Sequence, residues 1–270
     1  TGYGTDGTIW GGEVLLADYQ DFTRFGSITP FLQIGGDASA KEGWRIAVSM
    51  IYGYIKDREK AWKIIEKLRL CSEQESKVQF TMADRKINAV MSTSAGRLFD
   101  AVSAILGIRR QSSFEGEAST ALQFAAEAFE QKQILGSNKK QNICQTVDKQ
   151  SVNRKDTLCI LDTETLVQQM VEAKLQGADS DALAYLFHQM LAELIVAACI
   201  EARKSSSRNK VALSGGVFQN RLLLRLTEEQ LLLEGFEVLR HRMIPPNDGG
   251  IAIGQAAYGM NWLQKMEKEI

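Results

Sequence analysis

Two adjacent glycines between a strand-like and a helix-like segment constrain the fold of this chain more than any other feature. Residues 210–213 have the apolar character of a short buried strand, and residues 221–233 carry apolar side chains at helical spacing. Gly215 and Gly216 stand between them. Glycine adopts positive φ without strain and lacks the Cβ that would keep a ligand away from the backbone. The pattern therefore indicates either a nucleotide-binding turn or an ordinary tight strand-to-helix connection.

A second glycine-rich stretch opens the chain. Residues 1–13 contain five glycines, and residues 14–17 and 22–25 then have strand character on either side of a polar turn. Glycines on such a ribbon can direct several backbone N–H groups at one anion, which predicts a phosphate site; a plain glycine-rich hairpin fits the same residues. Asp6 and Glu13 are either turn formers or ligands of a cation beside a phosphate.

Several segments have the periodicity or the caps of helices. Asp37 is placed to cap a helix whose periodicity continues through Leu68. Residues 92–107 predict an amphipathic helix that ends at Gly107. In that helix we expect Asp100 near the polar face, paired with Arg97 one turn earlier in a surface ion pair of small consequence. Further helices are expected over residues 163–175 and 181–203, and strands over residues 157–161 and 237–239.

The last 30 residues contain a proline pair, an acidic turn and a small-residue helix. The prolines predict an extended entry, after which Asn247 or Asp248 caps a helix. That helix is rich in glycine and alanine, which predicts close packing against another element. Asp248 has two interpretations, because its carboxylate suits a helix N-cap and equally a ligand for a hard cation or iron.

Composition and charge exclude several classes of protein. Apolar residues make up 44% of the chain and its formal net charge is −1, which is ordinary for a globular protein and gives no basic footprint for nucleic acid. We expect no membrane-spanning run and no signal peptide, and the chain, which opens on threonine, resembles a piece of something longer. We therefore expect a cytoplasmic protein.

Cysteine and histidine offer no metal site or nucleophile of their own. The four cysteines, at positions 71, 144, 159 and 199, are widely spaced, form no CxxC pair and lie outside the glycine motifs. A disulfide framework, a zinc site and covalent catalysis by cysteine are therefore not expected. The two histidines, His188 and His241, have no partner at ligand spacing, and His188 lies in an apolar helix where packing is its expected role.

Six motifs in order carry a resemblance to a known family. They read TGYGTDGTIWGGE, GGDASAKEGWR, STSAGRLFDAVSAILG, FEGEASTAL, ALSGGVFQNRLL and PPNDGGIAIGQAAYG. The chain resembles the C-terminal domain of the HypF carbamoyltransferases of NiFe-hydrogenase maturation. That domain is itself similar to the universal tRNA threonylcarbamoyl-transferase ATPases and to antibiotic O-carbamoyltransferases. The resemblance extends from Thr1 to about Met260 and is weakest over residues 131–153.

The resemblance implies an α/β fold of the actin-like, ribonuclease-H-like class that includes sugar kinases, Hsp70 and actin. The chain would form mostly one lobe of that fold with added helices. Residues 1–270 would then be a single carbamoyltransferase C-terminal domain, incomplete at its N-terminus. Within it we expect a helical insertion over about 41–135 and a nucleotide-binding α/β core formed by about 1–34 and 157–270.

The resemblance also implies the site. The N-terminal ribbon matches a phosphate-binding hairpin, the Gly-Gly turn matches an adenosine motif, and Asp100 matches a carboxylate that faces the ribose. The implied nucleotide-binding residues are Gly2, Gly4, Gly7, Gly96, Asp100, Gly215, Gly216 and Asn220. Asp248 matches a metal ligand, of a divalent Fe, Zn or Mg ion. No catalytic residue can be assigned.

The implied reaction transfers a carbamoyl group from carbamoyl-adenylate, made from carbamoyl phosphate and ATP, to the C-terminal cysteine of the partner HypE. An O-carbamoyltransferase acting on a small-molecule hydroxyl, a kinase-type phosphotransferase and a non-catalytic nucleotide-binding module remain alternatives. The sequence departs from the family at Ile34 and Gly43, where prolines are usual. The family's other two metal ligands, a His-x-x-x-His pair, lie upstream of the matching region.

Overall fold

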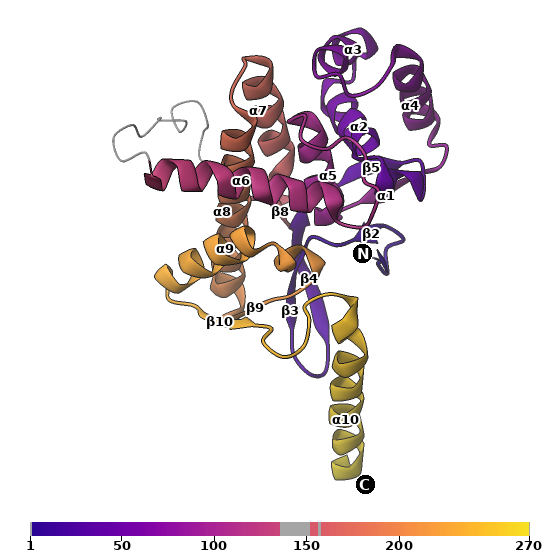
Figure 1. The fold of residues 1–270 in the computed structure, drawn as a ribbon. Coiled ribbons are helices and arrows are strands. Elements are labelled where there is room, and N and C mark those ends of the chain that lie inside the picture. Colours follow the sequence, from indigo (N-terminus) through magenta and orange to yellow (C-terminus); the bar gives the residue numbers. More distant parts are fainter. Residues whose placement is uncertain (1, 136–151, 156–157, 270) are drawn as a thin grey trace.

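The computed structural model describes residues 2–135, 152–155 and 158–269, and they form an α/β fold (Figure 1). One mixed sheet has the order β1-β2-β6-β5 and a second has the order β3-β4-β8-β7. A separate parallel pair joins β9 to β10. The strands are β1 (Gly2–Tyr3), β2 (Ile9–Trp10), β3 (Glu13–Ala17), β4 (Phe22–Ile28), β5 (Phe31–Ile34), β6 (Ala89–Ser92), β7 (Val152–Lys155), β8 (Leu158–Leu161), β9 (Lys210–Leu213) and β10 (Glu237–Arg240).

Helices pack around these sheets and supply most of the core. They are α1 (Ala38–Lys41), α2 (Gly43–Ile55), α3 (Arg58–Lys67), α4 (Glu73–Arg85), α5 (Ala95–Ile105), α6 (Glu117–Leu135), α7 (Thr163–Leu175), α8 (Ser180–Ser206), α9 (Arg221–Leu233) and α10 (Ile251–Glu269). Two short 3-10 turns, η2 (Gly216–Gln219) and η3 (Asp248–Gly250), precede α9 and α10. The predicted segments at 163–175, 210–213 and 221–233 coincide with α7, β9 and α9, and Asp162 caps α7 by accepting a hydrogen bond from the Thr165 N–H.

The central helix is α8, which contacts β3, β7 and β8 as well as α6, α7 and α9. By length and composition alone it could span a membrane, so the prediction that no run is long and apolar enough was wrong. Most of the apolar window is nevertheless buried inside the protein, which is typical of a core helix. Phe187 on α8 packs edge-on against Phe99 of α5, with ring centroids 5.0 Å apart.

The region between residues 38 and 67 differs from the continuous helix that Asp37 was expected to begin. The Asp37 side chain makes no capping hydrogen bond, and the backbone leaves the helical region at Glu42, separating α1 from α2. Lys56 ends α2 in a left-handed conformation, and Asp57 then caps α3 by accepting a hydrogen bond from the Lys60 N–H. Local backbone geometry therefore divides one predicted periodicity into three helices.

Gly43 has a clear structural role at the start of α2. A Cβ at this position would lie 2.6 Å from the backbone oxygen of Asp100, which is far inside van der Waals contact. Glycine therefore allows α2 to approach α5 closely. The strand β6 also lies in this part of the chain and pairs with β5 and β2, so residues 41–135 contain a sheet strand as well as helices.

The C-terminal helix α10 extends away from the rest of the molecule (Figure 1). The prediction that its glycines and alanines press against another element was wrong for the described residues, because a Cβ at Gly254 or Gly259 would meet no atom within 4 Å. Tyr258 and Asn261 hydrogen-bond to backbone oxygens in the turn between β3 and β4. These hydrogen bonds connect α10 to the β3–β4 turn.

Candidate functional site

The Gly215–Gly216 turn lies at the carboxyl end of the parallel strands β9 and β10. Leu213 ends β9 beside Arg240, which ends β10, so the loops that follow both strands emerge at the same edge. Gly215 has φ 99° and ψ 156°, a conformation that is essentially restricted to glycine. A Cβ there would meet no protein atom within 4 Å, so the turn faces open space. Ligands of open α/β sheets bind at such carboxyl edges.

Two further elements fix this turn in place. The Gly215 N–H donates to the backbone oxygen of Pro246 at 2.8 Å, which ties the turn to the segment that leads into η3. Val217 and Phe218, which follow in η2, pack against the main hydrophobic core. The glycines are thus exposed at a point where the backbone before and after them is anchored.

A serine and a histidine beside the turn were not predicted as site residues. Ser214 follows β9 and His241 follows β10, and His241 Nε2 lies 3.0 Å from Ser214 Oγ. Both side chains are exposed. The signal was present in the sequence, because Ser214 comes directly after the predicted strand 210–213 and His241 two positions after the predicted strand 237–239. The parallel pairing that brings them together was not foreseen.

Asn220 caps α9 and is buried, so its side chain holds the turn from behind. Its Oδ1 accepts a hydrogen bond from the Leu223 N–H at 3.0 Å, and its Nδ2 lies 2.8 Å from His188 Nε2. His188 Nδ1 lies 2.7 Å from the Ala184 carbonyl oxygen, which can only accept. Nδ1 therefore carries the proton and Nε2 accepts from Asn220. The predicted packing of His188 is confirmed.

The environment of His188 keeps its imidazole neutral. The side chain is fully buried on α8, and burial lowers its pKa to about 4, against a smaller opposite effect of the hydrogen bond to Ala184. A neutral ring is the form that the Asn220 amide requires as acceptor. The family resemblance assigned Asn220 to nucleotide binding. In this structure its side-chain amide instead donates to His188 inside the protein.

Asp100 lies inside the protein, so the surface ion pair expected with Arg97 was wrong. Its side chain is 5% exposed, and the carboxylate lies 2.7 Å from Arg97 Nη2. Burial raises the pKa of Asp100 to about 6, and Arg97 opposes that rise. The start of α2 packs against the backbone oxygen and Cβ of Asp100, which a Cβ at Gly43 would approach to 2.6 Å and 3.1 Å.

In the N-terminal ribbon, backbone carbonyls accept hydrogen bonds from two of the three glycine N–H groups that were expected to face a phosphate. The Gly4 N–H donates to the Thr8 carbonyl at 2.8 Å, and the Gly7 N–H donates to the Gly4 carbonyl at 3.1 Å. A Cβ at Gly4 would lie 2.2 Å from the Trp10 indole. The guanidinium of Arg24 stacks over the same indole, 4.2 Å from the ring centroid. Gly4 therefore serves the packing of Trp10.

The two acidic residues of the ribbon are turn formers in this structure. Asp6 accepts hydrogen bonds from the Thr8 hydroxyl at 2.7 Å and from Trp10 Nε1 at 3.0 Å, and the Thr8 hydroxyl is the main cause of its lowered pKa. Glu13 accepts from the backbone N–H of Gly12 at 2.7 Å. Arg24 bridges both carboxylates, at 2.9 Å from Asp6 and 3.1 Å from Glu13.

Helix α5 connects the ribbon with the Gly215–Gly216 turn. Its first residue, Ala95, donates its N–H to the Gly11 carbonyl at 3.2 Å, and η2 contacts the same helix. Gly96 lies in the first turn of α5, and a Cβ there would have nothing nearer than 3.8 Å. Gly96 thus lies in the first turn of a helix that both the ribbon and η2 contact, whereas the buried carboxylate of Asp100 is one turn further along α5.

Asp248 does not cap α10. Asn247 caps η3, the turn that leads into α10, since its Oδ1 accepts a hydrogen bond from the Gly249 N–H at 3.1 Å, and the Asp248 side chain is exposed in η3. Among residues 2–135, 152–155 and 158–269, no group of three His, Cys, Asp or Glu side chains could hold a metal ion. The described residues therefore supply one carboxylate, which does not make a metal site.

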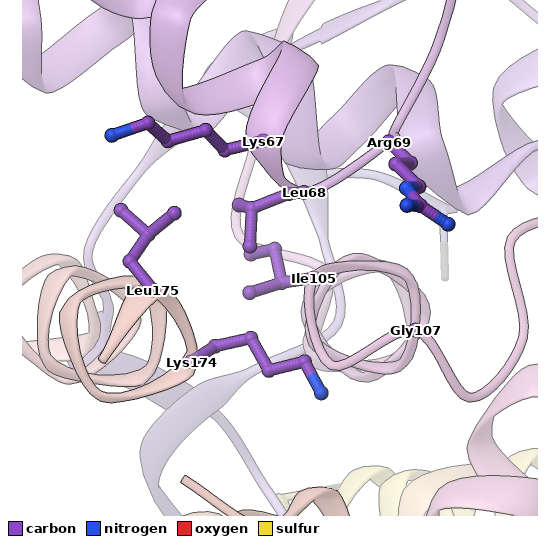
Figure 2. A pocket seen from close by; sticks show the side chains of 7 residues that line it. All are labelled: Lys67, Leu68, Arg69, Ile105, Gly107, Lys174 and Leu175. Atoms are coloured by element: carbon purple, nitrogen blue, oxygen red, sulfur yellow. The ribbon is translucent and has the colours of Figure 1, made fainter. Parts of the chain in front are cut away.

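Two cavities lie away from the glycine turns. The first, of about 460 Å³, lies where α3, α5 and α7 end, and Figure 2 shows its lining of Lys67, Leu68, Arg69, Ile105, Gly107, Lys174 and Leu175. Its three basic side chains compensate the negative ends of these helices, which is a structural role. The second, of about 240 Å³, lies between α6 and the start of α9.

Comparison with known proteins assigns this chain to a family. Residues 1–255 match the model of the carbamoyltransferase Kae1-like domain, second subdomain. The chain belongs to this carbamoyltransferase family. Among its relatives are the probable carbamoyltransferase HypF of Methanocaldococcus jannaschii, 30% identical over 94% of this chain, and the carbamoyltransferase HypF of Rhodobacter capsulatus, 34% identical over 94%.

Solved structures of the same family have the same fold. A crystal structure of full-length HypF in its phosphate- and nucleotide-bound form superposes with a TM-score of 0.84 at 32% identity over 97% of this chain. The structure of HypF from T. kodakarensis gives a TM-score of 0.77 at 26% identity. The predicted actin-like α/β fold is therefore confirmed. The chain spans 31% and 30% of the two relatives and 32% of the first crystal chain.

Proposed function

We propose that this chain takes part in carbamoyl transfer by binding the nucleotide of a carbamoyl-adenylate at the Gly215–Gly216 turn. The observation that carries the proposal is the open, glycine-only conformation of Gly215 at the carboxyl edge of two parallel strands. Its family membership supplies the reaction class, and one related crystal structure is described as nucleotide-bound. ATP and its AMP-containing product are the nucleotides proposed.

The chain's contribution is binding and orientation. Gly215 and Gly216 offer a floor without side chains for the base, and Gly96 offers a similarly open approach at the start of α5. Gly2, Gly4 and Gly7 remain proposed phosphate contacts, although the Gly4 and Gly7 N–H groups would have to leave their present partners. Asp100 remains the proposed ribose partner and would have to turn out of the interior.

The attacking nucleophile is proposed to come from the acceptor. Cys71 and Cys199 are buried, and burial raises the pKa of each thiol to about 12, so neither is a thiolate at neutral pH. Cys144 lies outside the described residues. An acceptor that brings its own thiol, such as the C-terminal cysteine of HypE, fits a chain in which Cys71 and Cys199 are protonated at neutral pH.

The same proposal includes a metal ion, a carbamoyl source and a cellular compartment. Asp248 would supply one exposed carboxylate to a divalent ion, Fe, Zn or Mg, whose other ligands come from elsewhere. Because the described residues do not form a metal site, no chemical step is assigned to that ion. The carbamoyl group would come from carbamoyl phosphate, and the compartment proposed is the cytoplasm. No direct contact with nucleic acid is proposed.

A domain exchange tests this function. The matched third of the Rhodobacter capsulatus relative is replaced by this chain, and transfer of a labelled carbamoyl group to a HypE C-terminal peptide is measured with ATP and carbamoyl phosphate. We expect labelled thiocarboxamide on the cysteine. ATP binding without transfer would identify a non-catalytic nucleotide-binding module, and transfer to small-molecule hydroxyls in place of the thiol would identify an O-carbamoyltransferase.

A further inference from the structure

The cavity of about 460 Å³ where α3, α5 and α7 end, which we call the three-helix cavity, has positive charge and no negative charge in its lining. Lys67, Arg69 and Lys174 line it together with apolar residues. The ion pairs formed among the described residues include none of these three cations. The smaller cavity differs, because its Arg225 lies 2.7 Å from a carboxylate oxygen of Glu130.

The helix ends at the three-helix cavity do not need these cations as hydrogen-bond donors. The Arg69 N–H donates to the carbonyl three residues earlier at 3.0 Å, and the N–H groups of Gly107 and Gly177 do the same at the ends of α5 and α7, each at 3.0 Å. All three residues have positive φ. Because glycine takes this position in two of the three helices, the backbone conformation does not require an arginine in the third.

The three cations compensate the negative helix ends, but their charge exceeds what those ends require. A helix C-terminus acts as about −0.5 of an elementary charge, so three such ends supply about −1.5. Lys67, Arg69 and Lys174 each carry one positive charge. A surplus of about +1.5 therefore remains at the cavity, and a phosphate monoester, with about −1.5 to −2 charges at neutral pH, matches it.

The ammonium group of Lys174 is held at the cavity by a neutral group. Its Nζ donates to Ser180 Oγ at 2.6 Å, and that hydroxyl donates in turn to the Leu106 carbonyl at 2.8 Å. The Lys174 side chain is half-buried. Since an ammonium has three N–H donors, two remain for a ligand. A hydroxyl orients the ammonium without neutralising it, so an anion beside it would stabilise a partly desolvated charge.

The rest of the lining is apolar. Leu68 and Ile105 lie in the middle of the lining in the view of Figure 2, with the charged side chains around them. A Cβ at Gly107 would meet no atom within 4 Å, so the backbone there leaves space for a ligand. The cavity volume of about 460 Å³ is in the range of small-molecule sites. This lining suits a phosphate attached to a compact apolar body.

We propose that the three-helix cavity binds a small-molecule phosphate monoester with an apolar body. Arg69 and Lys174 bind the phosphate oxygens, and Leu68 and Ile105 contact the apolar body. The site is separate from the Gly215–Gly216 turn and does not depend on the nucleotide proposed there.

Calorimetric titration of the 270-residue chain with phenyl phosphate, in the absence of nucleotide, tests the proposal. Inorganic phosphate and benzyl alcohol are titrated for comparison, because each carries only one of the two features that the cavity would recognise. We expect one saturable site for phenyl phosphate, about tenfold weaker binding of inorganic phosphate, and no binding of benzyl alcohol.

A matched pair of substitutions assigns the binding to this cavity. Arg69→Asn removes a cation from the lining, and Lys86→Asn removes one from the end of α4, outside the cavity. Both residues have positive φ, which asparagine tolerates. We expect Arg69→Asn to bind phenyl phosphate about tenfold more weakly and Lys86→Asn to bind it as the wild type does. Lys174→Met repeats the test on α7, and far-UV circular dichroism shows that each variant is folded.

Three outcomes would overturn the proposal. The absence of saturable binding of phenyl phosphate to the wild type would show that the cavity takes no such ligand. Equal weakening by Arg69→Asn and Lys86→Asn would show that the net surface charge, and not the cavity, attracts the anion. Equal affinities for inorganic phosphate and phenyl phosphate would show that Leu68 and Ile105 contact no part of the ligand.

Discussion

The two glycine turns of this protein look alike in sequence and differ in structure. At the N-terminal ribbon, Gly4 is required by the Trp10 indole, and backbone partners occupy its N–H. At the Gly215–Gly216 turn, no protein atom lies within 4 Å of a Cβ at Gly215, although its conformation demands glycine. Glycine therefore serves internal packing at position 4 and leaves the backbone open at position 215.

The two turns are also supported differently. The ribbon is held by exposed and half-buried groups around Arg24, which bridges Asp6 and Glu13. The Gly215–Gly216 turn is held from behind by Asn220 and His188, both buried. Solvent and salt reach the first set of contacts more easily than the second, so the open turn rests on the more rigid support.

The largest expected effect concerns the support of the open turn at low pH. Because the pKa of His188 in the folded protein is about 4, below the unfolded value of 6.5, this group's contribution to stability is fully present above pH 6.5. It is lost as pH falls to 4 and amounts to about 3 kcal/mol. Urea unfolding of the wild type and of His188→Gln from pH 7 to pH 4 measures it as the difference between the two.

The comparison with His188→Gln is needed because protonation of Asp100 changes the stability of the folded protein in the opposite direction. Its folded pKa of about 6 lies above the unfolded value, so the folded chain gains stability as pH falls from 6 to 4. Asp100 is present in both proteins and cancels in the difference. A difference that stays constant over this pH range would contradict the neutral, Asn220-bound state of His188.

The next largest effect tests the packing of Gly4 against Trp10 in the N-terminal ribbon. Gly4→Ala places a methyl group 2.2 Å from the Trp10 ring, which must then leave Arg24 and Asp6. We expect a loss of about 2 kcal/mol of stability. Gly2→Ala is the matched control, since a Cβ there meets no atom within 4 Å. Urea denaturation of the two variants compares them, and equal stability would show that Trp10 moves freely.

The smallest effect isolates one hydrogen bond behind the open turn. Asn220→Ser keeps an oxygen that can cap α9 and removes the donor to His188 Nε2. We expect a loss of about 1 kcal/mol, the usual net value of one hydrogen bond. In the His188→Gln background the same substitution should cost less. A double-mutant cycle with no coupling between the two positions would rule out the proposed contact.

Local patterns in the sequence predicted much of the fold. The strand at 210–213 and the helices at 163–175 and 221–233 were found because periodicity and caps are short-range signals. Similarity at six motifs supplied the family. The break of the helix at Glu42 was missed because the apolar pattern runs through it, while the close approach of α2 to Asp100 is decided by distant residues.

The candidate site was predicted less well, because its contacts join residues that are distant in the sequence. Asp100 was placed on the surface because helical spacing does not show which face a later helix covers, and it is buried. Asn220 and His188 are 32 positions apart, and Ser214 and His241 are 27 apart, so only tertiary packing brings each pair together. Gly215 and Gly216 were predicted correctly as a strand-to-helix turn, because that signal is local; their ligand remains a prediction.

Calorimetric titration of the chain with ATP tests the central claim most directly, comparing Gly215→Val with Gly177→Val. Both glycines have positive φ and open space around a Cβ, so both variants introduce backbone strain without a steric clash, but Gly177 lies between α7 and α8, outside the proposed site. We predict that the wild type and Gly177→Val bind ATP equally and that Gly215→Val binds about tenfold more weakly or worse. Equal affinities for all three proteins would contradict the assignment of the nucleotide to this turn.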